Sequence, residues 1–156
     1  MKNSSQIQLR QIQKELADNQ QFFDLPACRE ILDATIDFYK RVGFLSPWVG
    51  YFASLSDHIV GAAGFKGKPV NGTVEIAYGT FEPYQKQGVA TSICRELVEL
   101  ALRTDPSIRI TARTLPDGDF SIQILKKNGF VLLGTIEDPD DGQVCEWEYG
   151  KPNASL

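Results

Sequence analysis

The sequence contains few residues that could bind a metal ion or form a disulfide framework. Among 156 residues there are three cysteines and one histidine, and no two cysteines form a Cys-x-x-Cys pair. A structural zinc site needs about four cysteine or histidine ligands, so we expect no metal centre. An odd number of widely spaced thiols is also unlike the disulfide frameworks of small secreted domains. We therefore expect a cytoplasmic protein.

The sequence also lacks a long apolar run and an excess of positive charge. No apolar stretch approaches the roughly 20 residues of a membrane span, and the N-terminal sequence MKNSSQIQLR has no apolar core of a signal peptide. Lys and Arg number 16 against 20 Asp and Glu, which gives a net charge of −4. This balance does not favour bulk binding to nucleic acid or to an anionic membrane. We expect neither as a partner.

What remains is the composition of an ordinary globular protein. Hydrophobic residues make up 42% and charged residues 23% of the chain, so it can bury a core without a disulfide or a metal. No repeat and no low-complexity linker divides the sequence. We expect one domain over residues 1–156.

The hydrophobic pattern predicts the order of helices and strands. A short strand at 7–12 is followed by helical spacing over 14–23 and 27–42, and the period then changes to that of strands. We expect later strands at 48–55, 59–65, 73–81, 107–114, 131–136 and 144–149, and helices at 87–103 and 120–128. The strand–helix–strand step from 73–81 to 107–114 needs a crossover, which places one parallel pair in the sheet. The sequence therefore predicts an α+β fold, a mixed and mainly antiparallel sheet with helices on both faces.

The most informative segment joins a strand to the helix expected at 87–103. Its loop reads Gln85-Lys86-Gln87-Gly88-Val89-Ala90, and the small residues Gly88 and Ala90 let a ligand approach the backbone. The free amides of the helix's first turn and the helix dipole favour an anion there. No Gly-Lys-Ser/Thr follows, as in a Walker loop, and no G-x-G-x-x-G is present, as in a dinucleotide fingerprint. The loop alone predicts a phosphate site, with a plain turn into a core helix as the alternative.

This loop resembles the acetyl-CoA-binding motif of the GNAT superfamily of N-acetyltransferases, Q/R-x-x-G-x-G/A, with Gln85, Gly88 and Ala90 at the defining positions. A second segment, Ser121 to Phe130, is similar to the S-x-x-x-L-x-K-x-G-F helix of the same family. The order of elements between the two segments also matches. The resemblance covers about 48–149 and is closest to the branch with ribosomal-protein N-terminal and small-molecule acetyltransferases.

The resemblance implies a GNAT-like fold that uses acetyl-CoA as co-substrate and no metal. Residues 48–149 would form the acetyl-CoA-binding core, and the helical residues 1–47 would shape the acceptor side. The loop amides would hold the pyrophosphate, and the end of strand 73–81 would pair with the pantetheine arm like an added strand. Phe120, Ser121 and Leu125 would border the far side of the pantetheine channel. The implied cofactor-binding residues are Tyr78, Gly79, Thr80, Gln85, Lys86, Gln87, Gly88, Val89, Ala90, Thr91 and Ser121.

The catalytic residues are harder to assign because the chain departs from the family pattern. Leu125 stands where many members carry a tyrosine general acid. Glu75, in a segment that resembles the family's E-I-G-Y pattern, is the expected proton acceptor; the alternative is a solvent-facing or salt-bridged glutamate. The amide of Thr80 would polarise the thioester carbonyl. Ser121 would either protonate the leaving thiolate or cap a helix beginning at Ile122.

These residues together predict an N-acetyltransferase that moves acetyl from acetyl-CoA to a primary amine of a small molecule or a peptide. The chain offers no paired Cys/His or Ser/His, so attack would be direct, with no acyl-enzyme. The alternative is a non-catalytic GNAT-like domain that binds acyl-CoA as a sensor. A third reading is a phosphate- or nucleotide-binding domain without CoA chemistry. Dimers are common in the family, so a homodimer stays open.

Overall fold

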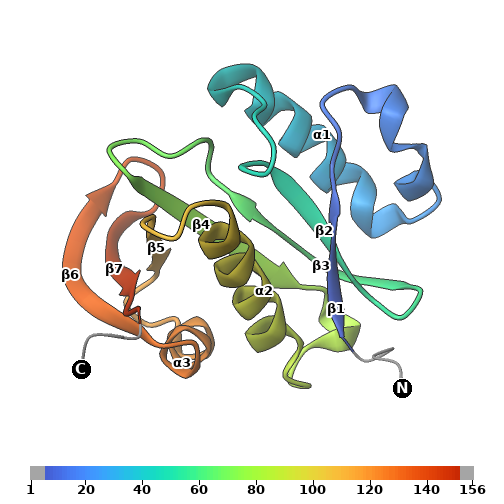
Figure 1. Ribbon diagram of the computed structural model, residues 1–156. Coiled ribbons are helices and arrows are strands. Elements are labelled where there is room, and N and C mark those ends of the chain that lie inside the picture. Colours follow the sequence, from blue (N-terminus) through green and yellow to red (C-terminus); the bar gives the residue numbers. More distant parts are fainter. Residues whose placement is uncertain (1–5, 152–156) are drawn as a thin grey trace.

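The computed structural model describes residues 6–151, and over these residues seven strands form one sheet in the order β1-β2-β3-β4-β5-β7-β6 (Figure 1). The strands are β1 Ile7–Gln11, β2 Gly50–Leu55, β3 His58–Phe65, β4 Thr73–Thr80, β5 Arg109–Thr114, β6 Phe130–Asp138 and β7 Gly142–Tyr149. The helices are η1 Leu16–Phe22, α1 Pro26–Val42, η2 Glu82–Tyr84, α2 Val89–Thr104 and α3 Asp119–Lys127, of which η1 and η2 are 3₁₀ helices. The predicted mixed and mainly antiparallel α+β fold is confirmed.

Helices cover both faces of the sheet. Phe22 of η1 packs on Phe52 of β2, with ring centroids 4.6 Å apart. On the other face, the Cδ1 atom of Ile93 in α2 approaches Gly61 of β3. Gly61 pairs with Ala53, which follows Phe52 in β2. Because side chains alternate along a strand, this face is opposite to the one on which Phe52 lies. Figure 1 shows α2 and α3 in front of the sheet and α1 behind β1 and β2. Over residues 6–151, no helix has the length and apolar character needed to cross a bilayer.

The segment expected as a regular helix at 14–23 is a short 3₁₀ helix with a kink at Asn19. The side chain of Asn19 is fully buried and bonds to the backbone instead. Its Oδ1 accepts from the amide of Gln13 at 2.7 Å, and its Nδ2 donates to the carbonyls of Gln13 (3.2 Å) and Glu15 (2.9 Å). Asparagine commonly competes with helical hydrogen bonding in this way, which is why helical spacing alone mispredicted the segment.

The crossover from β4 through α2 to β5 creates the feature that positions the site. β4 and β5 pair in parallel from Thr73↔Arg109 to Ile76↔Ala112, and there the pairing stops. β4 continues against β3 as far as Gly61↔Thr80, while β5 continues against β7 as far as Thr114↔Cys145. The two central strands therefore diverge after Ile76, and their last residues leave a gap between them.

Candidate active site

The backbone of β4 has free positions facing this gap. The amide of Lys66 donates to the carbonyl of Glu75, and the amide of Phe81 donates to the carbonyl of Val60, each at 2.8 Å. In an antiparallel ladder the hydrogen-bonding residues alternate, so the odd-numbered residues of β4 bond to β3. The backbone groups of Tyr78 and Thr80 consequently point toward β5, beyond the last β4–β5 pair at Ile76.

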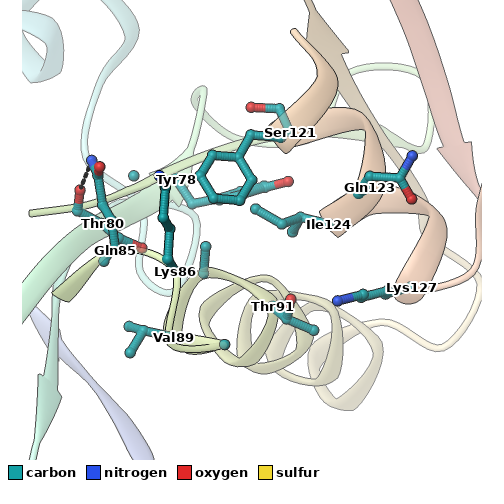
Figure 2. Close-up of a pocket in the computed structure, with 14 residues that line it drawn as sticks. Tyr78, Thr80, Gln85, Lys86, Val89, Thr91, Ser121, Gln123, Ile124 and Lys127 are labelled. Atoms are coloured by element: carbon teal, nitrogen blue, oxygen red, sulfur yellow. Dashed lines mark hydrogen bonds between the residues drawn. The ribbon is translucent and has the colours of Figure 1, made fainter. Parts of the chain in front are cut away.

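A cavity of about 640 Å³ lies between the end of β4, the start of α2 and one face of α3 (Figure 2). Of the residues predicted to bind the cofactor, all but Gln87 line it. The side chain of Gln87 instead donates from Nε2 to the carbonyl of Pro83 at 3.2 Å. The lining residues are Tyr78, Gly79, Thr80, Gln85, Lys86, Gly88, Val89, Ala90, Thr91, Phe120, Ser121, Gln123, Ile124 and Lys127.

The loop before α2 presents backbone amides to this cavity. Lys86 and Gly88 both have left-handed backbone angles, with φ of 64° and 80°, and such residues curve successive amides into an anion-binding concavity. Ser92 is the first residue of α2 whose amide bonds to a preceding carbonyl, that of Gly88 at 3.2 Å. The amides ahead of Ser92 belong to the set that a helix leaves unpaired at its N-terminus. A Cβ at Gly88 would meet no atom within 4 Å, so glycine is needed there for its backbone angle.

Gln85 connects this loop to the end of β4. Its Nε2 donates to the carbonyl of Thr80 at 3.1 Å (Figure 2). The bond satisfies the carbonyl that Thr80 turns toward the gap and leaves the amide of Thr80 available. The side chain of Gln85 therefore fixes the position of the end of β4.

The charges lining the larger cavity are all positive. Lys86 comes from the loop and Lys127 from α3, and Figure 2 shows Lys127 pointing toward Thr91. No carboxylate lines this cavity, and within residues 6–151 neither lysine forms an ion pair. Two unpaired cations beside helix-terminal amides suit a polyanion such as a pyrophosphate.

A smaller cavity of about 100 Å³ adjoins the larger one. Tyr78 and Ser121 line both, so the two cavities meet at these side chains. Glu75 lines the smaller cavity and not the larger. The complete lining of the smaller cavity is Lys66, Glu75, Ile76, Ala77, Tyr78, Ala112, Arg113, Thr114, Ser121 and Leu125.

Glu75 is held between two cations at the wall of the smaller cavity. Its Oε2 lies 2.9 Å from Nζ of Lys66, and its Oε1 lies 3.8 Å from Nε of Arg113. Arg113 also bonds from Nη1 to Oδ2 of Asp138 at 2.9 Å and lies 3.9 Å from Glu146. The salt-bridged alternative therefore describes the position of Glu75, and its role as a base stays a prediction.

Tyr78, which lines both cavities, forms a side-chain hydrogen bond with the buried Cys94 of α2. Burial, followed by the proximity of Cys94, raises the pKa of Tyr78 well above its usual range. Burial raises the pKa of the Cys94 thiol to about 12, although a hydrogen bond with Tyr78 opposes this. A thiol that stays protonated is a poor nucleophile, so this pair fits a site that works without an acyl-enzyme.

One alternative for α3, a helix cap at Ser121, is wrong, and a place for Leu125 beside a pantetheine channel stays a prediction. The helix begins at Asp119 with Gly118 as its N-cap and no side-chain cap, so Ser121 lies inside the first turn and caps nothing; it is exposed and lines both cavities. Leu125, expected beside the pantetheine channel, is 1% exposed and lines only the smaller cavity. The helix starts earlier because the amide of Ile122 already bonds to the carbonyl of Gly118 at 3.0 Å.

The sequence analysis missed several lining residues. Gln123, Ile124 and Lys127 follow Phe120 at intervals of three and four residues, the spacing of one helix face, and this signal was available once Phe120 was assigned to the channel. Lys66 and Arg113 carried no comparable signal, because their positions depend on strand register.

Comparisons with known proteins agree with this geometry. A family model described as "Acetyltransferase (GNAT) domain" matches residues 9–131. The chain is 34% identical over 116 residues to "Uncharacterized N-acetyltransferase YjdG" of Bacillus subtilis (strain 168), an alignment covering 73% of this chain and 66% of that protein. It is 27% identical over 85 residues to the ribosomal-protein-serine acetyltransferase of Escherichia coli (strain K12), covering 54% of this chain and 48% of that protein. The structure of AAC(6')-Ib in complex with paromomycin and acetyl-CoA superposes with a TM-score of 0.69 at 20% identity, covering 94% of each chain.

Proposed function

The chain belongs to the acetyltransferase (GNAT) family, and from this premise we propose that it transfers the acetyl group of acetyl-CoA to a primary amine. The observation that carries the proposal is the meeting of two cavities where β4 and β5 diverge. The larger is lined by helix-terminal amides and by two lysines that form no ion pair within residues 6–151, and the smaller is lined by a carboxylate. A nucleotide-bearing thioester and an amine can thus approach each other from different sides.

The larger cavity has the groups needed to hold acetyl-CoA. The amides from Gly88 to Thr91, with Lys86 and Lys127, would bind the pyrophosphate. The backbone of Tyr78 and Thr80 would pair with the pantetheine arm as an added strand does with a free sheet edge. This pairing would leave the thioester near Tyr78 and Ser121, where the larger cavity meets the smaller.

The residues at this boundary would carry out the transfer. The amide of Thr80 would donate a hydrogen bond to the thioester carbonyl and stabilise the charge that develops on its oxygen. Glu75 would accept a proton from the acceptor's ammonium, directly or through one water. Ser121 or solvent would return a proton to the leaving thiolate, since Leu125 supplies no acidic group.

The acceptor class follows from the smaller cavity and from the named relatives. Glu75 is the carboxylate in the lining of this cavity, where it can accept a hydrogen bond from an ammonium group but not from an ionised acid. One relative acts on a ribosomal protein, and the AAC(6')-Ib structure contains an aminoglycoside acetyltransferase. We therefore propose a peptide N-terminus or a small-molecule amine as acceptor. The three free cysteines support a reducing compartment, the cytoplasm.

A panel of acceptors tests the proposal. Peptide N-termini, polyamines and aminoglycosides would each be incubated with the protein and acetyl-CoA, with coenzyme A thiol release and product mass as readouts. We expect one class to give thiol release that saturates with both substrates. Saturable binding of coenzyme A without thiol release from any amine would instead indicate a non-catalytic acyl-CoA-binding domain.

A further inference from the structure

Lys66 places a primary amine of the protein itself beside the proposed base. It follows the last residue of β3, and its own amide donates to the carbonyl of Glu75 at 2.8 Å. Its side-chain Nζ lies 2.9 Å from Oε2 of Glu75. The side chain is 46% exposed, so it is not locked inside the core. An amine in this position has the functional group on which the proposed reaction acts.

The smaller cavity is small, and Lys66 is part of its lining. Its volume is about 100 Å³. Lys66 lines it together with Tyr78 and Ser121, which also line the larger cavity. A lysine side chain has a flexible four-carbon stem, so rotation about its bonds can move Nζ from Glu75 toward this boundary.

The other lysines near the site do not have both a carboxylate partner and a place in the lining of the smaller cavity. Lys86 and Lys127 line the larger cavity, where the phosphates are proposed to bind, and neither is paired with a carboxylate within the described residues. Lys68 is only two residues after Lys66, is exposed and lines neither cavity. Lys68 is therefore a natural reference for acetylation by chance contact with acetyl-CoA.

We infer that Lys66 is a site of self-acetylation, an inference that rests on the proposed acetyltransferase function. Glu75 takes one proton from the Lys66 ammonium and passes it to solvent. The freed lone pair of Nζ forms a bond to the thioester carbonyl carbon, and the carbon–sulfur bond breaks with its electron pair left on sulfur. The second proton lost by nitrogen ends on this thiolate. The products are Nε-acetyl-lysine and coenzyme A thiol.

This modification also changes the acceptor side of the site. An acetylated Lys66 loses its charge and therefore its ion pair with Glu75, and the added acetyl group occupies part of a small cavity. An external amine and Lys66 compete for the same thioester. Self-acetylation is consequently fastest without acceptor, and the modified protein turns over its acceptor more slowly.

The test is site-resolved labelling of the full chain by isotopically labelled acetyl-CoA in the absence of any amine, followed by peptide mass mapping. We expect Lys66 to approach one acetyl group per chain, at a rate that saturates with acetyl-CoA and is independent of protein concentration. Lys68 should be labelled slowly and in proportion to acetyl-CoA, as it is in the unfolded chain. Lys66→Arg should remove the fast label and Lys68→Arg should retain it. Glu75→Gln should slow labelling of Lys66 by about 10²-fold.

A parallel measurement of the melting temperature with and without coenzyme A separates self-acetylation of Lys66 from the proposed acetyltransferase function. If coenzyme A stabilises the protein but Lys66 is labelled no faster than Lys68, the self-acetylation is wrong and the proposed function is untouched. If coenzyme A gives no stabilisation and no lysine is labelled faster than in the unfolded chain, both proposals are wrong. Because the main comparison, Lys66 against Lys68, is made within the wild-type chain, a variant that fails to fold does not obscure the result.

Discussion

Glu75 is a carboxylate between two cations, and this arrangement determines how it can act as a base. The ion pairs with Lys66 and Arg113 orient both of its oxygens. A charged carboxylate is ready to accept a proton, whereas a protonated one is not. In the proposed reaction, an arriving ammonium would compete with Lys66 for the same carboxylate oxygen of Glu75.

Replacing Glu75 by glutamine should slow catalysis without weakening coenzyme binding. The variant keeps the size of the side chain and removes its basicity, so kcat should fall by about 10²-fold. The loss should shrink as the pH rises, because more of the acceptor amine is already neutral. The KM for acetyl-CoA should hardly change, since Glu75 does not line the larger cavity.

Glu146→Gln is the matched control for this experiment. Glu146 also approaches Nε of Arg113, at 3.9 Å, but lines neither cavity. Its kcat should stay near that of the wild type. A Glu75→Gln variant with wild-type kcat at neutral pH would assign the base elsewhere.

Lys86 and Lys127 should contribute to coenzyme affinity through charge. Each lysine reaches the larger cavity from solvent, and an exposed ionic contact is worth no more than about 1 kcal/mol, or about fivefold in Kd. Lys86→Ala and Lys127→Ala should each raise the Kd for coenzyme A within this limit and reduce its dependence on salt. Titration calorimetry at two ionic strengths measures both effects. Lys126 is adjacent to Lys127 but does not line the cavity, so Lys126→Ala should leave the Kd and its salt dependence unchanged. Equal effects of Lys126→Ala and Lys127→Ala would argue against a local contact of Lys127 with coenzyme A.

Among the elements, the start of α2 has the most specific geometry for an anion. Gly88 is its N-cap with φ of 80° and ψ of 2°, and glycine, asparagine and aspartate tolerate this left-handed region better than other residues. A side chain added there meets no protein atom within 4 Å. The position therefore allows charge to be tested separately from shape.

Gly88→Asp should abolish the stabilisation by coenzyme A, while Gly88→Asn should keep part of it. Both side chains have similar size, but only the carboxylate repels a pyrophosphate. For the wild type, coenzyme A at about 100 times its Kd should stabilise the fold by about 2.7 kcal/mol. Chemical denaturation with and without coenzyme A measures this difference. A folded Gly88→Asp variant that gains the full amount would show that the phosphates bind elsewhere.

The hairpin of β6 and β7 depends on Asp138 at its turn. Hydrogen bonds from the amide of Asp140, then from Arg113 and the amide of Asp141, hold the pKa of Asp138 below its usual value. A carboxyl with a lowered folded pKa stabilises the protein above its unfolded pKa, and this contribution is lost as the pH falls through the folded value. The arrangement should thus weaken in acid.

Asp138→Asn should be more costly at neutral pH than in acid. Asparagine can still accept from the two amides through its one carbonyl oxygen, so the variant removes the charge together with the acceptor for Arg113. Urea unfolding should show a larger difference from the wild type near about pH 6 than near about pH 3, on either side of the ordinary aspartate pKa. A difference that is the same at both values would show that the charge of Asp138 does not contribute.

The elements with a strong period were predictable, and the contacts between distant elements were not. The buried residues Val89, Ile93, Leu97 and Ala101 of α2 recur at helical spacing, which is enough to predict the helix. The link from Glu75 to Arg113 depends on strand register, and a shift by one residue would turn either side chain to the other face. The kink at Asn19 depends on burial of its side chain, which spacing does not report.

For the whole molecule, the central feature is the separation of β4 from β5 within one sheet. The crossover makes these strands parallel neighbours, and their pairing ends at Ile76↔Ala112 while each keeps its other partner. The end of β4 therefore has free backbone groups without exposing the rest of the sheet. The larger cavity opens at the helix terminus beside this gap and the smaller one at the carboxylate.

The most direct test of this account is a single-turnover transfer followed by mass spectrometry. The protein would be loaded with labelled acetyl-CoA and mixed with an excess of each amine class, with the label traced to amine, protein or intact thioester. We predict that for one class the label appears on the amine nitrogen, one acetyl group for each coenzyme A thiol released. If the thioester stays bound and intact in the presence of every amine, the protein binds acetyl-CoA without transferring its acetyl group, and the account is contradicted.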